Sequence, residues 1–172
     1  PPNSLSHVLE DPVMEARLDV KDFSLNHALL GRADILGSWD KELGGVRLNA
    51  DIRRDSACTT RVIGYVSPKM KGLDLHIQAG GTPLSFLQPF VENIFSNVNG
   101  SVHGDVRLFG PFSQLDLEGK VKAQMQMKVN ILNATFLASA DSVHIASGLF
   151  RFQNVRLQDT EGHTGLANGE LR

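Results

Sequence analysis

The sequence predicts a mainly β protein in which antiparallel strands follow one another along the chain. Apolar and polar residues alternate with a period of two over much of the sequence, and successive side chains of a strand point to opposite faces. Turn signals such as Gly44-Gly45, Ser67-Pro68 and Gly110-Pro111 separate the alternating stretches. A pair of strands for each glycine-spaced phrase indicates a meander or a solenoid-like stack.

The longest alternating stretch runs from Leu115 to Ile131. Its odd positions are all apolar residues or glycine, whereas its even positions are Lys, Gln, Asn, Asp or Glu. At about 3.3 Å per residue this predicts an extended strand of roughly 55 Å with one apolar face and one polar, solvent-exposed face. Gly119 predicts a bend or a bulge within it.

Shorter alternating stretches predict the remaining strands. They are expected at residues 16–25, 46–53, 61–67, 73–79, 102–108, 135–138, 142–146, 149–152 and 155–158. Together with 115–131 this makes about ten strands. Residues 31–37 and 165–171 repeat the glycine-spaced phrase of 100–121, and the last of them reads as a strand just beginning.

One segment departs from the strand pattern. Between Pro83 and Asn99 the apolar residues recur at spacings of three and four, which predicts one short amphipathic helix near 84–97. We expect this helix either to close or line one end of an apolar surface or to pack onto the sheet. The residues expected to act as such a plug are Phe86, Leu87, Phe90 and Ile94.

Composition excludes several classes of function. The 172 residues carry a formal net charge of −2 without a basic run, which argues against nucleic-acid binding. The single cysteine, Cys58, excludes an intrachain disulfide and a thiolate zinc site. No stretch approaches the roughly 18 apolar residues of a transmembrane helix. The chain begins without Met, so we expect residues 1–172 to form one β-rich segment of a longer protein.

The sequence contains no recognisable catalytic or metal-binding motif. It lacks a Gly-x-Ser-x-Gly elbow, a phosphate-binding glycine loop and a His-Glu-x-x-His pattern, and its six histidines are scattered. We therefore expect a protein that is not an enzyme, with no cofactor and no metal. Lys120, Lys122 and Lys128 share the wet face of their strand. They are interpreted as a solvated outer face, with anionic-lipid binding as the alternative.

The apolar face of the long strand has two interpretations. Such alternation commonly forms the core of a closed β-sandwich. The length of the stretch and the paired flexible side chains of Met125 and Met127 instead favour a ligand-lined groove. Both interpretations stay open at this point.

Several phrases resemble the C-terminal region of the TamB family, which belongs to the AsmA-like bridge proteins of Gram-negative cell envelopes. The resemblance covers roughly residues 83–172. The phrases that carry it are residues 86–90, 94–100, 104–110, 116–119, 141–143, 152–155, 159–165 and 169–171.

This resemblance implies a fold and a function. The fold would be a long curled sheet, a β-taco or half-pipe with an apolar concave face. The protein would be anchored in the inner membrane, cross the periplasm and engage an outer-membrane partner of the Omp85 family. Its expected roles are phospholipid transport between the membranes and assembly of outer-membrane proteins. The expected groove lining is Val106, Leu108, Leu115, Leu117, Val121, Met125, Met127, Val129 and Ile131.

Three other functions remain as alternatives. The first is a module that templates outer-membrane strands by edge pairing. The second is a closed β-sandwich with a structural or adhesive role and no ligand. The third is a hydrolase in which scattered polar residues converge in a cleft.

Overall fold

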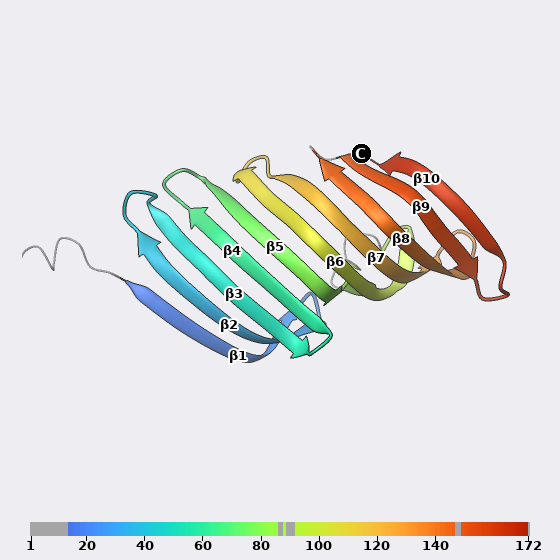
Figure 1. The fold of residues 1–172 in the computed structure, drawn as a ribbon, viewed down its shortest axis with the longest axis horizontal. Helices are drawn as coiled ribbons and strands as arrows, with labels where there is room; N and C mark the ends of the chain where they lie inside the picture. Colours follow the sequence, from blue (N-terminus) through green and yellow to red (C-terminus); the bar gives the residue numbers. More distant parts are fainter. Residues whose placement is uncertain (1–13, 86–87, 89–91, 147–148, 172) are drawn as a thin grey trace, which may run out of the picture.

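The computed structural model describes residues 14–85, 88, 92–146 and 149–171, and these form one ten-stranded antiparallel sheet (Figure 1). The order of the strands in the sheet is their order in the sequence. They are β1 (Glu15–Leu25), β2 (Ala28–Asp40), β3 (Gly45–Asp55), β4 (Cys58–Ser67), β5 (Gly72–Pro83), β6 (Phe95–Pro111), β7 (Asp116–Val129), β8 (Ala134–Ala146), β9 (Leu149–Asp159) and β10 (Thr164–Leu171). The predicted mainly β, antiparallel meander is therefore confirmed.

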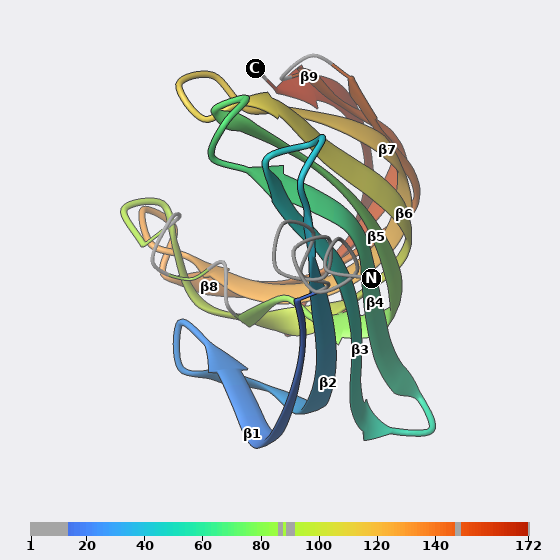
Figure 2. The ribbon, with the colours of Figure 1, turned by 90° about the vertical axis from the view of Figure 1, so that its left-hand side faces the viewer.

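The sheet is not closed. Within the described residues β1 and β10 each have a strand neighbour on one side only. Figure 2 shows that the strands curve together into an arc with one open side. β2 and β5 also come close together, although they are not paired with each other in the sheet. The architecture is thus a curled single layer.

Three strands were divided or not located in the prediction. The segments predicted at 135–138 and 142–146 are one strand, β8, and those at 149–152 and 155–158 are one strand, β9. A register shift interrupts the pairing of β7 with β8, and another interrupts that of β9 with β10. A bulge moves the alternation by one residue, so each strand looks like two in the sequence. β2 was indicated only by the glycine phrase at 31–37.

The helix predicted near 84–97 is not confirmed. Residues 86–87 and 89–91, which include Phe86, Leu87 and Phe90, lie outside the described residues. Residues 95–97, which were expected at its C-terminal end, belong instead to β6. The Gln88 side chain bonds to that strand: its Nε2 donates to the Phe95 carbonyl at 2.9 Å, and its Oε1 accepts the Val98 amide at 2.8 Å. These bonds satisfy backbone groups at the bulge between Ser96 and Asn99.

Two glycines permit close packing between β6 and β7. Gly104 lies opposite Val121, and Gly119 lies opposite Val106. Both have positive φ, +140° and +152°, and an added Cβ would lie 2.4 Å from the Lys120 carbonyl oxygen and 2.2 Å from that of Asp105. The pairing shows no register shift at Gly119, so there is no bulge at this residue, and its lack of a side chain permits the close approach of β6.

We expect Gly119→Ala to lower the free energy of unfolding by at least about 1–2 kcal/mol, because the new Cβ would strain the backbone and collide with β6. Urea denaturation followed by circular dichroism measures the change. The matched control is Gly165→Ala in β10, where an added Cβ would have no atom within 4 Å. Its effect should stay within about 0.5 kcal/mol. Equal effects of the two substitutions would contradict this account of the close approach between β6 and β7.

Candidate functional site

The candidate site is the face of the sheet that carries the odd-numbered side chains of β7, here called the apolar face. Residues directly opposite each other in neighbouring strands point to the same side. The pairing register therefore places apolar residues or glycine next to one another from strand to strand, in rows that cross the sheet. The central row is Leu18, Ile35, Ala50, Val62, Ile77, Val106, Gly119 and Ile145.

Two parallel rows flank the central row. One contains Val20, Ala33, Ile52, Thr60, Ala79, Gly104, Val121, Val143 and Phe152. The other contains Ala16, Gly37, Leu48, Gly64, Leu75, Leu108 and Leu117. Strands lie about 4.8 Å apart, so the eight strands of the central row span roughly 34 Å. The only polar side chain in these rows is Thr60, whose hydroxyl bonds to that of Thr82 at 2.7 Å.

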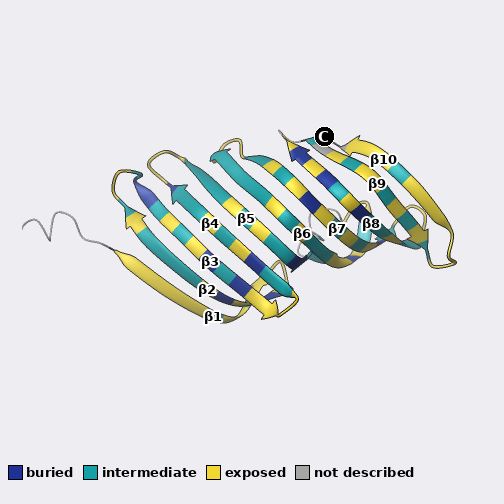
Figure 3. Cartoon of the chain, in the orientation of Figure 1, coloured by how far each residue is buried: buried dark blue, intermediate teal, exposed yellow. Residues whose placement is uncertain are grey.

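Burial is deeper on the apolar face than on the opposite face in the middle of the strands. Ala33, Val121 and Val143 on the apolar face are buried, whereas Lys120 and Lys122 on the other face are exposed. Most of the apolar rows is nevertheless only half-buried, including Val62, Ile77 and Leu108 (Figure 3). In the described part of the chain no second sheet covers them.

The structure brings together part of the groove lining expected from the sequence. Val121 belongs to a buried cluster with Ala140, Val143 and Ile145. Val106 and Leu117 pack against this cluster, and Leu108 lies opposite Leu117. Two expected lining residues are elsewhere. Leu115 lies in the β6–β7 turn and Ile131 in the β7–β8 turn, where Ile131 is 90% exposed. The strand is shorter at both ends than the alternation indicated, because the turns themselves continue the apolar–polar pattern.

The remaining expected residues lie in the second half of β7. Met125 is half-buried opposite Ala138, Met127 is buried opposite Phe136, and Val129 is the last residue of the strand. Of the expected plug, only Ile94 is described: it lies in a turn, is mostly exposed, and its carbonyl accepts the Asn130 amide at 3.0 Å. The lipid-binding role of all these residues stays a prediction.

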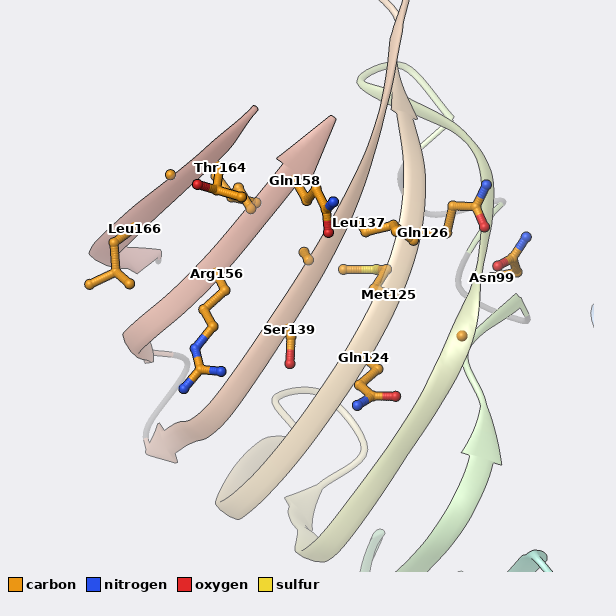
Figure 4. A pocket seen from close by; sticks show the side chains of 14 residues that line it. Asn99, Gln124, Met125, Gln126, Leu137, Ser139, Arg156, Gln158, Thr164 and Leu166 are labelled. Atoms are coloured by element: carbon orange, nitrogen blue, oxygen red, sulfur yellow. The ribbon is translucent and has the colours of Figure 1, made fainter. Parts of the chain in front are cut away.

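A hollow of about 780 Å³ lies over β6–β10 (Figure 4). Met125 is the only expected lining residue that contributes to it. The other contributors come largely from two rows of the face opposite the apolar face, and they include Gln124, Gln126, Ser139, Arg156 and Gln158. The exposed side chains of Leu137 and Leu166 also line it. The hollow therefore has mixed polar and apolar walls, unlike the apolar rows.

The face opposite the apolar face, here called the polar face, carries ion pairs between neighbouring strands. Arg32 bonds to Asp19 across β1 and β2, and Arg151 bonds to Glu170 across β9 and β10. These pairs are largely exposed, so each contributes little to the free energy of folding. All four charged side chains lie on the polar face and therefore point away from the apolar face.

Arg107 in β6 forms ion pairs with acidic residues of both neighbouring strands. Its guanidinium donates two hydrogen bonds to Asp74 in β5, at 2.9 and 2.8 Å, and one to Glu118 in β7 at 3.1 Å. It also lies 4.2 Å above the centre of the Phe109 ring. The hydrogen bonds from Arg107 hold the pKa of Asp74 below its ordinary value, against the opposing effect of burial. This cluster joins three central strands on the polar face.

Comparison with known proteins finds no matching family model, no similar curated protein and no similar solved structure. Within the described ranges, no His, Cys, Asp and Glu side chains gather in a set of three or more suited to a metal ion. Among the same residues there is no helix with the length and hydropathy needed to span a bilayer.

Sequence reasoning assigned the lining to β6 and β7 and missed the share of β1–β5. Their alternation was recognised, but as separate strands. The missing information was the consecutive antiparallel order of the strands. When each strand pairs with the next, the apolar residues Leu18, Val62 and Ile77 lie in the same row as Val106. β2 was hidden because Gly31 and Gly37 replace large side chains on the apolar face.

We expect Asp74→Asn to lower the free energy of unfolding by about 1 kcal/mol at neutral pH, because Arg107 loses its charged partner. Asp74 has a depressed pKa in the folded state, so its contribution is present above the pKa of the unfolded chain and is lost as the pH falls through the folded value. Urea denaturation of wild type and variant should therefore give curves that converge in acid. A difference that persists well below the ordinary pKa of aspartate would exclude this ion pair as its cause.

Proposed function

We propose that this chain is a non-enzymatic segment of a periplasmic, envelope-spanning protein of the TamB type, and that its apolar face binds the acyl chains of phospholipids. In this proposal the parent protein is anchored in the inner membrane and meets an outer-membrane protein of the Omp85 family. The sheet provides a groove for phospholipid transport between the two membranes. The observation that carries the proposal is the continuity of the apolar rows over neighbouring strands.

The hydrophobic effect explains why such a face suits an acyl chain. Each CH₂ group transferred out of water contributes about 0.8 kcal/mol. The apolar rows run for roughly 34 Å, which exceeds the hydrocarbon depth of one membrane leaflet, about 15 Å. Because similar side chains recur at every strand, a lipid would find similar contacts at each step. A small, even variation in binding free energy favours movement along the face over retention at one point.

The half-exposed state of the rows supports the same proposal. A water-soluble sheet gains by burying Val62, Ile77 and Leu108, yet these side chains retain contact with solvent. A contiguous exposed apolar surface is characteristic of a binding site. Charged groups such as Arg107 and Asp74 lie on the opposite face and leave the apolar rows uninterrupted.

A role in assembling outer-membrane proteins is a second part of the proposal, and it would act through pairing at an edge of the sheet. An edge strand presents backbone groups that can pair with an added strand. This second role requires only an accessible edge and is independent of lipid binding.

We expect a photo-reactive residue in place of Val106 to crosslink phospholipid in vesicles several-fold more than the same residue in place of Asp105. The two positions are neighbours in β6, but Val106 is on the apolar face and Asp105 is exposed on the polar face. Mass spectrometry of the crosslinked protein measures the yields.

Circular dichroism of both variants provides the control for an intact sheet. Equal crosslinking at the two positions would contradict the proposed groove. Absence of crosslinking at Val106 in a folded protein would favour the alternative, a structural or adhesion module without a ligand.

A further inference from the structure

The two long borders of the apolar face differ in their charge. The first border, here called the lysine rim, consists of the turns at residues 41–44, 68–71 and 112–115. It carries Lys41, Lys69 and Lys71 with one acidic turn residue, Glu42. The opposite rim includes the turns at residues 26–27, 56–57, 92–94, 130–133 and 160–163. Its turns contain Glu92 and Glu161 and no lysine.

Two of the acidic residues next to the lysine rim are engaged by groups of the protein itself, whereas Glu15, the first residue of β1, is exposed at the same end of the sheet. Asp40, the last residue of β2, is paired with Arg47 at 2.8 Å. Asp116, the first residue of β7, accepts the amide of the residue that follows it at 2.8 Å. These contacts limit the competition of both carboxylates with an external anion for the lysines.

The strand ends at the opposite rim add further acidic groups. Asp55 and Asp159 are the last residues of β3 and β9. They also accept hydrogen bonds from their own turns, Asp55 from the Ala57 amide and Asp159 from the His163 amide, both at 2.8 Å. The basic residues closest to the ends of strands at this rim are Arg54 and Lys128, and Lys128 lies on the polar face with Lys120. An anionic group above the apolar face is therefore drawn toward the lysine rim.

Hydrogen bonds join the turns of the lysine rim into a continuous border. The Ser67 hydroxyl, which is fully buried, donates to the Leu43 carbonyl at 2.6 Å and accepts the Met70 amide at 3.1 Å. The Lys69 amide donates to the Gly44 carbonyl at 3.3 Å, and the Phe112 amide donates to the Lys71 carbonyl at 2.8 Å. The lysines are thus held in sequence along the same border.

Trp39 lies between this border and the apolar rows. It is the only tryptophan of the chain and is 43% exposed. Register places it on the apolar face in a fourth row with Val46, Val66 and Leu73. A tryptophan between apolar side chains and lysines matches the boundary between hydrocarbon and headgroups, where indole rings and long cationic side chains collect.

The width of the face fits one leaflet of lipid. Along β2, the positions Trp39, Gly37, Ile35 and Ala33 all face the apolar side. Six residues at about 3.3 Å each give roughly 20 Å, compared with about 15 Å for the hydrocarbon of one leaflet. An acyl chain can therefore lie across the rows while its headgroup remains at the border.

We propose that phospholipids bind with their acyl chains across the apolar face and their phosphodiester groups over the lysine rim, close to Trp39. This orientation rests on the proposed lipid-binding function and adds a direction to it. The lysines contribute electrostatic attraction to the phosphate, and the opposite turns contain no lysine, so that Arg54 and Lys128 at the strand ends are the nearest competing cations there.

Trp39 fluorescence provides the test, with the 172-residue chain and phosphatidylglycerol. One lipid carries a quencher on its headgroup, and the other carries bromine near the end of its acyl chains. We expect the headgroup quencher to reduce Trp39 emission more than the chain-end quencher does. Stronger quenching from the chain end, with lipid bound, would overturn the orientation and leave the proposed function intact. Absence of bound phosphatidylglycerol by mass spectrometry would overturn both.

A pair of matched double variants tests the role of the lysines. Lys69→Gln with Lys71→Gln should weaken phosphatidylglycerol binding roughly tenfold, and binding of diacylglycerol, which lacks the phosphate, should change little. Lys120→Gln with Lys122→Gln removes the same charge from the polar face and should leave both affinities nearly unchanged. Equal losses in the two double variants would show a general charge effect and overturn the assignment to the rim.

Discussion

The structure depends on the register of consecutive antiparallel strands. Each strand pairs with the next one in the sequence. This order places apolar residues opposite one another in rows that cross the sheet, for example from Leu18 to Ile145. A shift of one residue in any pair would turn the side chains of that strand to the other face. The hydrophobic effect and the hairpin connections therefore enforce the same register. This agreement allows a single layer with few fully buried side chains to hold one shape.

The separation of the two faces follows from that register. Ion pairs such as Arg107 with Asp74 bridge strands on the polar face, and the lysines of the rim lie at a border. Burial of charge in the apolar rows would be costly, so the charged residues are confined to positions that water reaches. Burial differs in the same way, because Val121 and Val143 on the apolar face are buried whereas Lys120 and Lys122 on the polar face are exposed. A closed sandwich would bury the apolar rows completely, whereas this sheet leaves them half-buried.

Much of the fold could be predicted from the sequence because alternation is a local signal. β3, β5 and β7 were located from period-two patterns in which each apolar side chain has a clear polar neighbour. The signal failed where local geometry changed the phase. β8 and β9 contain bulged pairings, β2 carries glycine on its apolar side, and the helical spacing of 84–97 runs into the first residues of β6. The strand ends at Leu115 and Ile131 were misplaced because turn residues can continue an alternating pattern by chance.

The candidate site was harder to predict than the strands, because it exists only between them. No local motif states that Ile77 lies beside Val106 or that Trp39 lies beside Val46; both neighbours follow from pairing. The asymmetry of the two rims has the same origin. In a meander, alternate turns fall on opposite borders, so lysines at positions 41, 69 and 71 gather at one border although they are distant in sequence. A groove that is apolar in the centre and has borders of different charge can distinguish the two ends of an amphipathic molecule. Recognition of a lipid by this sheet would therefore arise from strand order, without any dedicated binding motif.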